Sequence, residues 1–243
     1  MNKARKIAIA GATGMVGQSF LKLLEKNYFQ DSEISLLASS NSAGKEINFR
    51  GKNYKVEDLS KFNFSEFDLA LFSAGSSVAS TYAPIVVSQG CVVVDNSSCF
   101  RYEDDIPLIV PEVNSKVLDD YELPGIIANP NCSTIQMLVA LKPLHDEFVI
   151  ERIDVTTFQA VSGTGKKATE ELMDQIEAYE GNTEIKSSIY AKPIANNVLP
   201  HCDVLEENRY TKEENKLVKE THKILDPNIQ VAATCVRVPV LNG

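Results

Sequence analysis

The sequence predicts an α/β protein with a Rossmann-like, doubly wound nucleotide-binding domain at residues 1–129 and an α+β domain at residues 130–243. Three observations support this prediction. Short apolar runs alternate with helical patterns in the first half of the chain, a glycine-rich turn joins the first strand to the first helix, and the second half has longer strands. We expect the sheet of the second domain to be largely antiparallel.

The predicted strands of the first half are short and apolar, and they lie at residues 6–10, 34–38, 69–72 and 91–94. Residues 16–26 have a helical apolar pattern, carried by Phe20, Leu21, Leu23 and Leu24. Residues 76–88 form a second predicted helix. Strands that alternate with helices in this way build βαβ units around a parallel sheet.

The second half of the chain has a different pattern. A helix is predicted at residues 133–144, closing at Pro143, and further helices at 166–179 and 211–225. Residues 149–161 alternate through Ile153, Val155 and Phe158, which is typical of a strand, and residues 229–240 form a second long strand. Long strands separated by helices indicate an α+β domain.

Composition excludes several classes of partner. Of 243 residues 44% are hydrophobic, and the net charge of -9 argues against nucleic acid or anionic membrane as a partner. No apolar run has membrane-spanning length, and residues 7–10 are too short for the core of a signal peptide. Five cysteines without a CxxC pair favour a reducing compartment, and three histidines without ligand spacing predict no metal site. We therefore expect a cytoplasmic protein.

Three glycines, Gly11, Gly14 and Gly17, lie between the first strand and the first helix. Glycine in this position allows a tight turn and a close approach of the backbone to a pyrophosphate, which the helix N-terminus stabilises. The spacing is GxxGxxG and departs from the common GxGxxG. A tight turn without a ligand is the alternative, but the strand–turn–helix context favours dinucleotide binding.

The end of the second strand is where such folds contact the adenosine ribose. Residues 38–44 contain no acidic side chain that would accept a hydrogen bond from a 2′-hydroxyl. Ser39 could donate to a 2′-phosphate, although no arginine is present to pair with that phosphate. NADP is therefore favoured over NAD as the cofactor.

Cys132 stands in a polar segment, Asn129-Pro-Asn-Cys-Ser-Thr134, directly before a predicted helix. The positive end of a helix favours the thiolate form of a cysteine in its first turn. A single cysteine is most often a small core residue, and this interpretation is kept for the other four. The polar setting after a strand of a nucleotide-binding fold indicates a nucleophile for Cys132.

Further candidate residues are ambiguous from the sequence alone. The loop after Gln159, which contains Ser162 and Gly163, could lie against a nicotinamide ring or could be a simple turn. Glu213 and Lys216 share a face of a predicted helix, where a solvated ion pair is the simpler interpretation. Two arginines are further candidates: Arg101 follows the segment Asn96-Ser-Ser-Cys-Phe100, and Arg237 lies within an apolar run. An arginine in an apolar strand needs a carboxylate or an anionic ligand as a partner. The three histidines, His145, His201 and His222, are expected to have structural or surface roles.

Taken together, these segments resemble the aspartate-semialdehyde dehydrogenases. The matching stretches are Gly11-Ala-Thr-Gly-Met-Val-Gly17, Phe72-Ser-Ala-Gly75, Asp95-Asn-Ser-Ser98 with Phe100-Arg101, Val110-Pro-Glu-Val-Asn114, Asn129-Pro-Asn-Cys-Ser-Thr134, Phe158-Gln-Ala-Val-Ser-Gly163 and Arg237-Val-Pro-Val240. Glyceraldehyde-3-phosphate dehydrogenases and N-acetyl-glutamyl-phosphate reductases share the architecture but differ around the cysteine.

The resemblance implies NADPH-dependent reduction of L-aspartyl phosphate to aspartate semialdehyde, with release of phosphate, in the biosynthesis of lysine through diaminopimelate, methionine and threonine. It implies that Cys132 forms a thioacyl intermediate oriented by Gln159. The implied substrate-binding residues are Arg101 and Lys216 for phosphate, Arg237 for the carboxylate, Glu213 for the amino group, and Asn131. The implied cofactor-binding residues are Gly11, Thr13, Gly14, Met15, Val16, Ser39, Ser42, Ser73, Gly75, Ser162 and Gly163. A homo-oligomer, a dimer or a tetramer, is implied through the second domain, which would bind substrate and dimerise.

The sequence departs from the family pattern at two places. Asn41 stands where the family commonly has an arginine, so that use of NAD is possible. The family pattern continues with a catalytic histidine immediately after Gly243, and we expect this chain alone to have little or no dehydrogenase activity. A catalytically silent homologue that binds nucleotide or partner subunits is the alternative function. Another acyl-phosphate or aldehyde reductase on the same scaffold is a further one.

Overall fold

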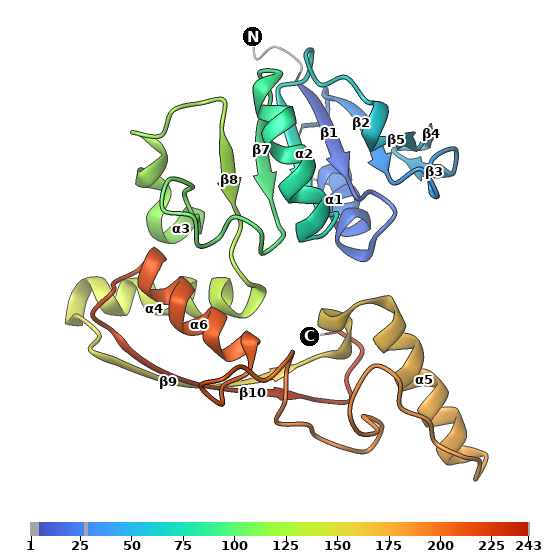
Figure 1. Cartoon of the computed structure of the whole chain (residues 1–243), viewed down its shortest axis with the longest axis vertical. Coiled ribbons are helices and arrows are strands. Elements are labelled where there is room, and N and C mark those ends of the chain that lie inside the picture. The colour runs from blue at the N-terminus through green and yellow to red at the C-terminus, as the bar shows by residue number, and fades with distance from the viewer. Residues whose placement is uncertain (1–4, 27–28, 243) are drawn as a thin grey trace. The chain divides into compact units, whose positions relative to one another are not determined.

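Figure 1 shows the computed structural model of the chain, which describes residues 5–26 and 29–242. The chain forms two compact units, residues 1–130 and residues 131–243. Each unit has its own sheet and its own buried clusters. The two units are described separately below.

The N-terminal unit is built on a six-stranded sheet with the order β5-β2-β1-β6-β7-β8. The strands are β1 (Lys6–Ala10), β2 (Glu33–Ala38), β5 (Glu57–Asp58), β6 (Leu69–Phe72), β7 (Val92–Asp95) and β8 (Ile126–Ala128), and every pair is parallel. Strand order reverses beside β1, because β2 lies on one side of it and β6 on the other. Ligands of doubly wound sheets bind at the carboxyl ends of strands at such a reversal.

Two helices cover the two faces of this sheet (Figure 1). Successive side chains of a strand point to opposite faces, so β1 supplies both sides of the core. Ile7 and Ile9 pack in one buried cluster with α1 (Met15–Lys26), whereas Ala8 and Ala10 pack in the other with α2 (Ser76–Ser88). The doubly wound fold expected from the sequence is confirmed. An antiparallel hairpin of β3 (Glu46–Phe49) and β4 (Lys52–Lys55), and the short helix α3 (Pro111–Asn114), complete the unit.

Sequence patterns located the strongly apolar strands and the helix α2 of this unit and missed four other strands. Strands β1 and β6 and helix α2 have the predicted bounds, and β7 lies one residue later than predicted. Strands β3, β4 and β5 were not predicted, because polar residues leave them without an apolar run such as those of β6 and β7, and β8 was not predicted because it has only three residues.

The C-terminal unit contains α4 (Cys132–Phe148), β9 (Arg152–Gln159), α5 (Lys166–Glu180), α6 (Lys212–Ile224) and β10 (Gln230–Arg237). The two long strands pair along their whole length, from Arg152 opposite Gln230 to Gln159 opposite Arg237. Leu217 of α6 packs in a buried cluster with Ala233 and Cys235 of β10. This register places the carboxyl ends of both strands side by side.

The direction of this strand pair differs from the expectation of a largely antiparallel sheet. Strands β9 and β10 run parallel, and isolated antiparallel bridges join Leu199 to Arg237 and Leu205 to Thr211. The connection between the strands carries α5 and α6, and a crossover of that length returns the chain to begin the next strand in the same direction. Strand length alone does not specify direction.

The predicted end of α4 at Pro143 is wrong, because the helix continues to Phe148. A proline inside a helix removes one backbone hydrogen bond, but local contacts support the next turn. Lys142 and Asp146 form an ion pair four residues apart. The chain then leaves the helix through Val149 in the left-handed conformation, and the N–H of Ile150 donates to Nδ1 of His145 at 3.2 Å.

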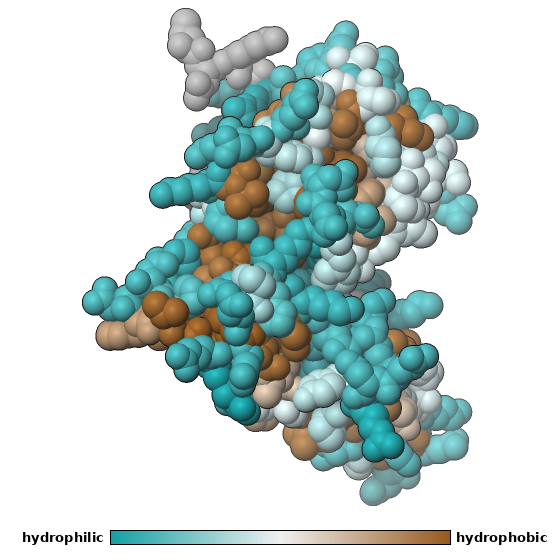
Figure 2. Space-filling model, turned by 60° about the vertical axis from the view of Figure 1, so that its left-hand side comes forward, coloured by the Kyte–Doolittle hydropathy of each residue, from teal (hydrophilic) through white to brown (hydrophobic). Residues whose placement is uncertain are grey.

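Hydrophobic side chains gather on one face of the C-terminal unit, on the left of the lower half of Figure 2. Exposed apolar side chains of this unit lie at the end of α4, namely Leu144, Phe148 and Val149, and separately near the carboxyl end of β9, where Phe158 has 72% of its surface exposed. Apolar patches of this kind mark interaction surfaces. Within the described residues, no helix has both the length and the apolar content that crossing a bilayer requires.

Candidate active site

Cys132 is the first residue of α4, and its thiol is exposed to solvent. The helix begins here because Asn131 is an N-cap: it has extended backbone angles, and its Oδ1 accepts a hydrogen bond from the N–H of Ser133 at 2.9 Å. The N-terminus of a helix favours negative charge. The sequence therefore folds locally so that a thiol is presented at the positive end of a helix.

Asn131 is held in place by two glutamates of α6. Its backbone N–H donates to Oε2 of Glu220 at 2.7 Å, and its Nδ2 donates to Oε1 of Glu213 at 2.9 Å. All three residues are buried. Sequence reasoning missed Glu220, which lies 89 positions from Asn131.

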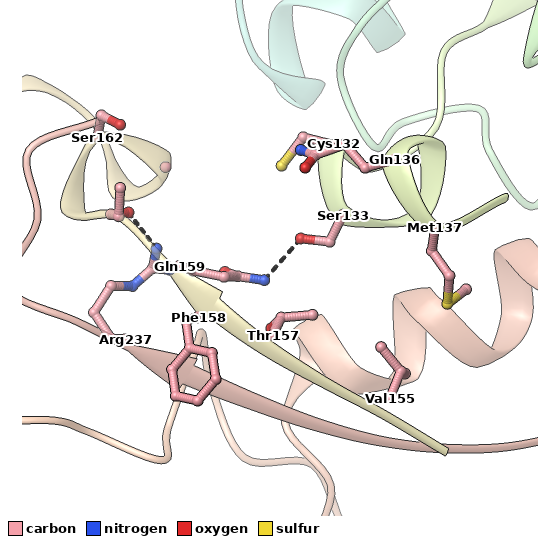
Figure 3. Close-up of a pocket in the computed structure, with 12 residues that line it drawn as sticks. Cys132, Ser133, Gln136, Met137, Val155, Thr157, Phe158, Gln159, Ser162 and Arg237 are labelled. Atoms are coloured by element: carbon pink, nitrogen blue, oxygen red, sulfur yellow. Dashed lines mark hydrogen bonds between the residues drawn. The ribbon is translucent and has the colours of Figure 1, made fainter. Parts of the chain in front are cut away.

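Gln159 ends β9 and faces the thiol-bearing end of α4 (Figure 3). Its Nε2 donates to Oγ of Ser133 at 2.9 Å and to Oε1 of Glu213 at 3.2 Å. The side chain is thereby fixed beside Cys132, in the hollow that both residues line. An amide held at this position could orient a group attached to the sulfur.

Glu213 and Lys216 form a partly buried pair, and the interpretation of a solvated surface pair does not describe them. Nζ of Lys216 lies 2.9 Å from Oε2 of Glu213 and 3.0 Å from Oδ2 of Asp203. Burial alone would raise the pKa of Glu213, but the charge and hydrogen bond of Lys216, with the amides of Asn131 and Gln159, outweigh it and lower that pKa. Burial likewise opposes the charge of Lys216, and its two carboxylate partners raise its pKa.

Arg237 ends β10 and is only 5% exposed. One terminal nitrogen donates to the carbonyl of Ala160 at 2.6 Å. A dashed line at Arg237 marks this hydrogen bond in Figure 3. Its Nε is buried and has no hydrogen-bond partner among the described residues. A Cβ on Gly163 would lie 3.1 Å from the guanidinium, so glycine leaves room beside it. A buried guanidinium with an unused donor suits an anionic ligand.

These residues line two hollows that share Cys132, Gln159, Gly163 and Arg237. The first, of about 520 Å³, is also lined by Ser133, Gln136, Met137, Val155, Thr157, Phe158, Ala160 and Ser162. The second is also lined by Asn131, Thr164, Ile189, Tyr190, Ala191, His201, Asp203, Val204, Glu213 and Lys216. Every candidate site residue that the sequence indicated in this unit therefore lies on one or both. His201, for which we expected a structural or surface role, lies on the second.

The remaining cysteines differ from Cys132 in exposure. Burial raises the pKa of Cys91 and of Cys202 to about 12, and that of Cys235 to about 11. Cys99 is half-buried, and burial raises its pKa as well. No group of three or more histidine, cysteine or acidic side chains is placed to hold a metal ion in the part of the chain that the structure describes.

In the N-terminal unit the glycine-rich turn follows β1 directly. Gly11 has φ +86°, and a Cβ there would lie 2.4 Å from the carbonyl oxygen of Ser73. A Cβ on Gly17 would lie 2.3 Å from the carbonyl oxygen of Gly11. The N–H groups of Gly11 and Ala12 both donate to the carbonyl of Leu37. Glycine is thus required at two of the three positions of the motif by its backbone surroundings.

A hollow at the carboxyl ends of β1, β2 and β6 contains five of the predicted cofactor residues of this unit. Its lining is Gly11, Thr13, Gly14, Ala38, Ser39, Ser40, Asp58, Leu59, Ser60, Ser73, Ala74, Val78 and Tyr82. Met15, Val16, Ser42 and Gly75 do not line it. The glycine turn, the hydroxyl groups and the apolar side chains fit a dinucleotide, whose phosphates need close backbone and whose adenine needs an apolar wall.

Two charged residues were not identified from the sequence: Asp58 in this hollow, and Lys45 beside the predicted cofactor residue Ser42. Asp58 lines it and accepts hydrogen bonds from the N–H and Oγ of Ser60, which lower its pKa. Nζ of Lys45 lies 3.5 Å from Oγ of Ser42. Asp58 ends β5, a strand too short to predict, and is paired in register with Ala38. Lys45 lies one position beyond residues 38–44, the segment expected to contact the adenosine ribose.

Arg101 belongs to the N-terminal unit and is 6% exposed. Its guanidinium donates to the carbonyl groups of Asn96 and Ser97, at 3.1 Å in each case. Burial raises the pKa of Asp95, although hydrogen bonds from Ser97 and the charge of Arg101 oppose this. The guanidinium is therefore fixed just beyond the carboxyl end of β7.

Comparison with known proteins agrees with this architecture. Residues 6–121 match the model of the semialdehyde dehydrogenase NAD-binding domain, and residues 141–243 match that of the semialdehyde dehydrogenase dimerisation domain. The first indicates a nicotinamide cofactor, and the second indicates assembly into a homo-oligomer.

Relatives and solved structures resemble the chain over nearly its whole length. It is 54% identical over 244 residues to an aspartate-semialdehyde dehydrogenase of Legionella pneumophila, covering all of this chain and 70% of the relative. It is 53% identical to one of Aquifex aeolicus, covering 98% of this chain and 71% of the relative. A crystal structure of aspartate semialdehyde dehydrogenase II from Vibrio cholerae superposes with a TM-score of 0.95 at 47% identity, covering 99% of this chain and 72% of that one. The chain belongs to the aspartate-semialdehyde dehydrogenase family.

Proposed function

We propose that this protein reduces L-aspartyl phosphate to L-aspartate semialdehyde with NADPH, through a thioester on Cys132. The observation that carries the proposal is the position of the thiol. Cys132 is exposed at the start of α4 and lines a hollow together with Lys216, Glu213 and Arg237. A nucleophile, two cations and a carboxylate in one hollow suit a substrate with an acyl phosphate, a carboxylate and an amino group.

In the first step the thiolate of Cys132 attacks the acyl carbon, the carbon–oxygen bond to phosphate breaks, and inorganic phosphate leaves. We assign Lys216 to the departing phosphate, because its ammonium offsets the charge of that group. We assign Arg101 of the N-terminal unit to the phosphate as well. Asn131 sets the position of the sulfur, and Gln159 orients the thioester carbonyl.

Arg237 and Glu213 are assigned to the two ends of the amino-acid part of the substrate. The guanidinium of Arg237 has an unused buried donor, which suits the substrate carboxylate. The carboxylate of Glu213, kept ionised by Lys216 and the neighbouring amides, suits the substrate amino group. This pair of contacts would select an α-amino acid over a sugar phosphate.

When bound, the nicotinamide supplies the hydride that converts the thioester to the aldehyde and releases the thiolate. We propose that Gly11, Thr13, Gly14, Met15, Val16, Ser39, Ser42, Ser73 and Gly75 bind this cofactor, with Ser162 and Gly163 beside its nicotinamide. Lys45 stands next to Ser42 and supplies a positive charge for a 2′-phosphate, which favours NADPH. We also propose a dimer or tetramer, and a cytoplasmic location in which the five free cysteines stay reduced.

The proposal is tested by trapping the thioester, a step that needs no cofactor. The full chain is incubated with acetyl phosphate, a small acyl phosphate, and its mass is measured before and after treatment with hydroxylamine. We expect one acetyl group on the peptide containing Cys132, removed by hydroxylamine and missing in Cys132→Ala. Cys99→Ala is the matched control and should acylate like the wild type. Equal acylation of Cys132→Ala would contradict the proposal.

A further inference from the structure

We propose that Glu220 is a positioning residue for the nucleophile: its carboxylate fixes the N-cap of α4 and thereby the place of the Cys132 thiol. This inference rests on the proposed role of Cys132. Glu220 lies in α6, far from Cys132 in the sequence, and it lines neither of the two hollows that contain Cys132. Its effect on the thiol is therefore indirect and passes through Asn131.

Two glutamates of α6, Glu213 and Glu220, hold Asn131 at two points, and we call this pair the clamp. Glu213 and Glu220 are seven residues apart, which is two turns of α6, so their side chains leave the same face of the helix. Glu213 accepts the side-chain amide of Asn131 at 2.9 Å, and Glu220 accepts its backbone N–H at 2.7 Å. One helix thus fixes both the side chain and the backbone of a single residue.

The clamp acts directly on the first turn of α4. An N-cap residue sets where a helix begins, because its side chain accepts a hydrogen bond from the N–H two residues later. Asn131 does so through the N–H of Ser133, and Ser133 in turn accepts the amide of Gln159. Cys132 stands between these two residues. Holding the backbone N–H of Asn131 therefore fixes the sulfur relative to Gln159 and to the hollow.

Burying the carboxylate of Glu220 costs free energy, which hydrogen-bond partners must offset. Its exposed surface is 0%, and a buried carboxylate loses its hydration. A structural role in packing α6 is the competing explanation, and Glu214 provides the comparison. Glu214 is also buried in α6 and accepts a backbone N–H, that of Cys235 at 2.9 Å. It caps α6 through Thr211 and makes none of the three contacts that fix Asn131.

The experiment separates the reach of the Glu220 side chain from its charge. Glu220→Gln keeps the length and an acceptor oxygen but removes the charge, whereas Glu220→Asp keeps the charge and withdraws the oxygen by about one bond. The measured quantity is the rate of Cys132 acylation by acetyl phosphate, in variants shown by thermal unfolding to be folded at the assay temperature. We expect Glu220→Gln to stay within about threefold of the wild type and Glu220→Asp to fall by on the order of tenfold or more.

The same pair of substitutions at Glu214 is the matched control, and we expect neither to change the acylation rate more than about twofold. The inference is overturned if both Glu220 variants acylate at the wild-type rate, if Glu220→Asp keeps the rate while Glu220→Gln loses it, or if both lose it. It is also overturned if the Glu214 variants slow acylation as much as Glu220→Asp does, since packing would then explain the loss.

A second measurement keeps the inference testable if Glu220→Asp does not fold or if Cys132 is not acylated at all. Alkylation of Cys132 by iodoacetamide, followed by peptide mass spectrometry, needs no acyl phosphate, and half-buried Cys99 serves as the internal reference. Hydrogen exchange of residues 129–137 is measured on the same samples. We expect Glu220→Ala to exchange faster than the wild type in this segment and to change the ratio of Cys132 to Cys99 alkylation. In Glu220→Gln we expect both the exchange rate and the alkylation ratio to stay close to the wild-type values. An unchanged ratio and unchanged exchange in Glu220→Ala would overturn the inference, whereas absent acylation in the wild type would count against the proposed function alone.

Discussion

The two candidate sites of this protein are built from different materials. The dinucleotide site of the N-terminal unit is mainly a backbone structure, in which Gly11 and Gly17 leave space that a Cβ would fill. The thiol site of the C-terminal unit is a network of side chains, in which buried Glu213 and Glu220 hold the residue before Cys132. The dinucleotide site depends on the missing Cβ atoms of its glycines, and the thiol site depends on charges and hydrogen bonds.

This difference predicts how each site fails. A backbone site fails when a side chain is added, and it should be insensitive to pH because no buried charge maintains it. A network of buried charges fails when one partner is removed, and its stability should depend on pH. Each prediction below tests one side of this contrast, from the largest expected effect to the smallest.

Gly11→Ala is expected to have the largest effect. The new Cβ would lie 2.4 Å from the carbonyl oxygen of Ser73, and φ is +86°. We expect the N-terminal unit to lose about 3–5 kcal/mol of unfolding free energy and its cofactor binding, measured by denaturant unfolding and by NADPH fluorescence. The control is Gly44→Ala, where φ is +87° and no atom lies within 4 Å of the new Cβ, so that only about 1–2 kcal/mol is expected. Equal losses in the two variants would mean that close approach to Ser73 is not what requires glycine.

Lys216→Met is the corresponding test of the C-terminal unit. Removing one partner of a largely buried ion pair should cost about 3 kcal/mol near neutral pH, since Glu213 is left without its cation. The lowered pKa of Glu213 stabilises the folded state above its ordinary value of 4.5, and this contribution is lost as pH falls through the folded pKa. The raised pKa of Lys216 stabilises it below 10.5, and that contribution is lost as pH rises through the folded pKa.

The free-energy difference between wild type and Lys216→Met should therefore be greatest between pH 4.5 and 10.5 and smaller outside that window. Urea unfolding across this range measures it. Lys166→Met removes an exposed pair with Glu170 and should change stability by less than about 0.5 kcal/mol at any pH. A loss for Lys216→Met that is the same at pH 3 and at pH 7 would argue against an electrostatic origin.

The same contrast explains what could be predicted from the sequence. The glycine turn is contiguous in the chain, and β1 and α2 are long enough to show their apolar patterns. These features can therefore be predicted from short stretches of sequence. The network around Cys132 joins Asn131 to residues 82 and 89 positions away, and no local pattern indicates such contacts. Family resemblance identified Glu213, whereas Glu220 became visible only when α6 was seen to pack against the start of α4.

Local rules also failed where tertiary contacts outweighed them. Pro143 predicted the end of a helix, but the ion pair between Lys142 and Asp146 supports a further turn, and the helix ends only at the left-handed Val149. Strand β5, which contains Asp58, has two residues and carries no periodic signal. The direction of β9 relative to β10 follows from the long connection between them rather than from either strand's own residues.

Asn131→Ala should show a smaller effect that is specific to the thiol. Loss of the N-cap hydrogen bond to Ser133 costs about 1–2 kcal/mol, and the partner oxygen of Glu213 loses a donor as well. We expect acylation of Cys132 by acetyl phosphate to slow by on the order of tenfold or more. Thr211→Ala removes the N-cap of α6, with a similar cost in stability, but should leave the acylation rate nearly unchanged. If Thr211→Ala slows acylation equally, general loosening of the unit accounts for both results.

The smallest effect concerns cofactor choice, the one property for which the backbone site should depend on charge. Lys45 stands 3.5 Å from Ser42, and the carboxylate of Asp58 lines the hollow and is kept ionised by its hydrogen bonds to Ser60. The 2′-phosphate of NADPH is attracted by the lysine and repelled by the aspartate, whereas NADH lacks that group.

We expect Lys45→Met to weaken NADPH binding by roughly three- to tenfold. We expect Asp58→Asn, which keeps the hydrogen bonds to Ser60, to strengthen NADPH binding by roughly two- to fivefold. Both effects should shrink as salt is raised from 0.05 to about 0.5 M, since exposed charges are screened. Affinity for NADH, measured in the same titrations, is the internal control, because a change in the shape of the hollow would alter both cofactors together. Equal shifts for NADH and NADPH would show that neither charge selects the cofactor, and backbone groups alone would then account for binding at this site.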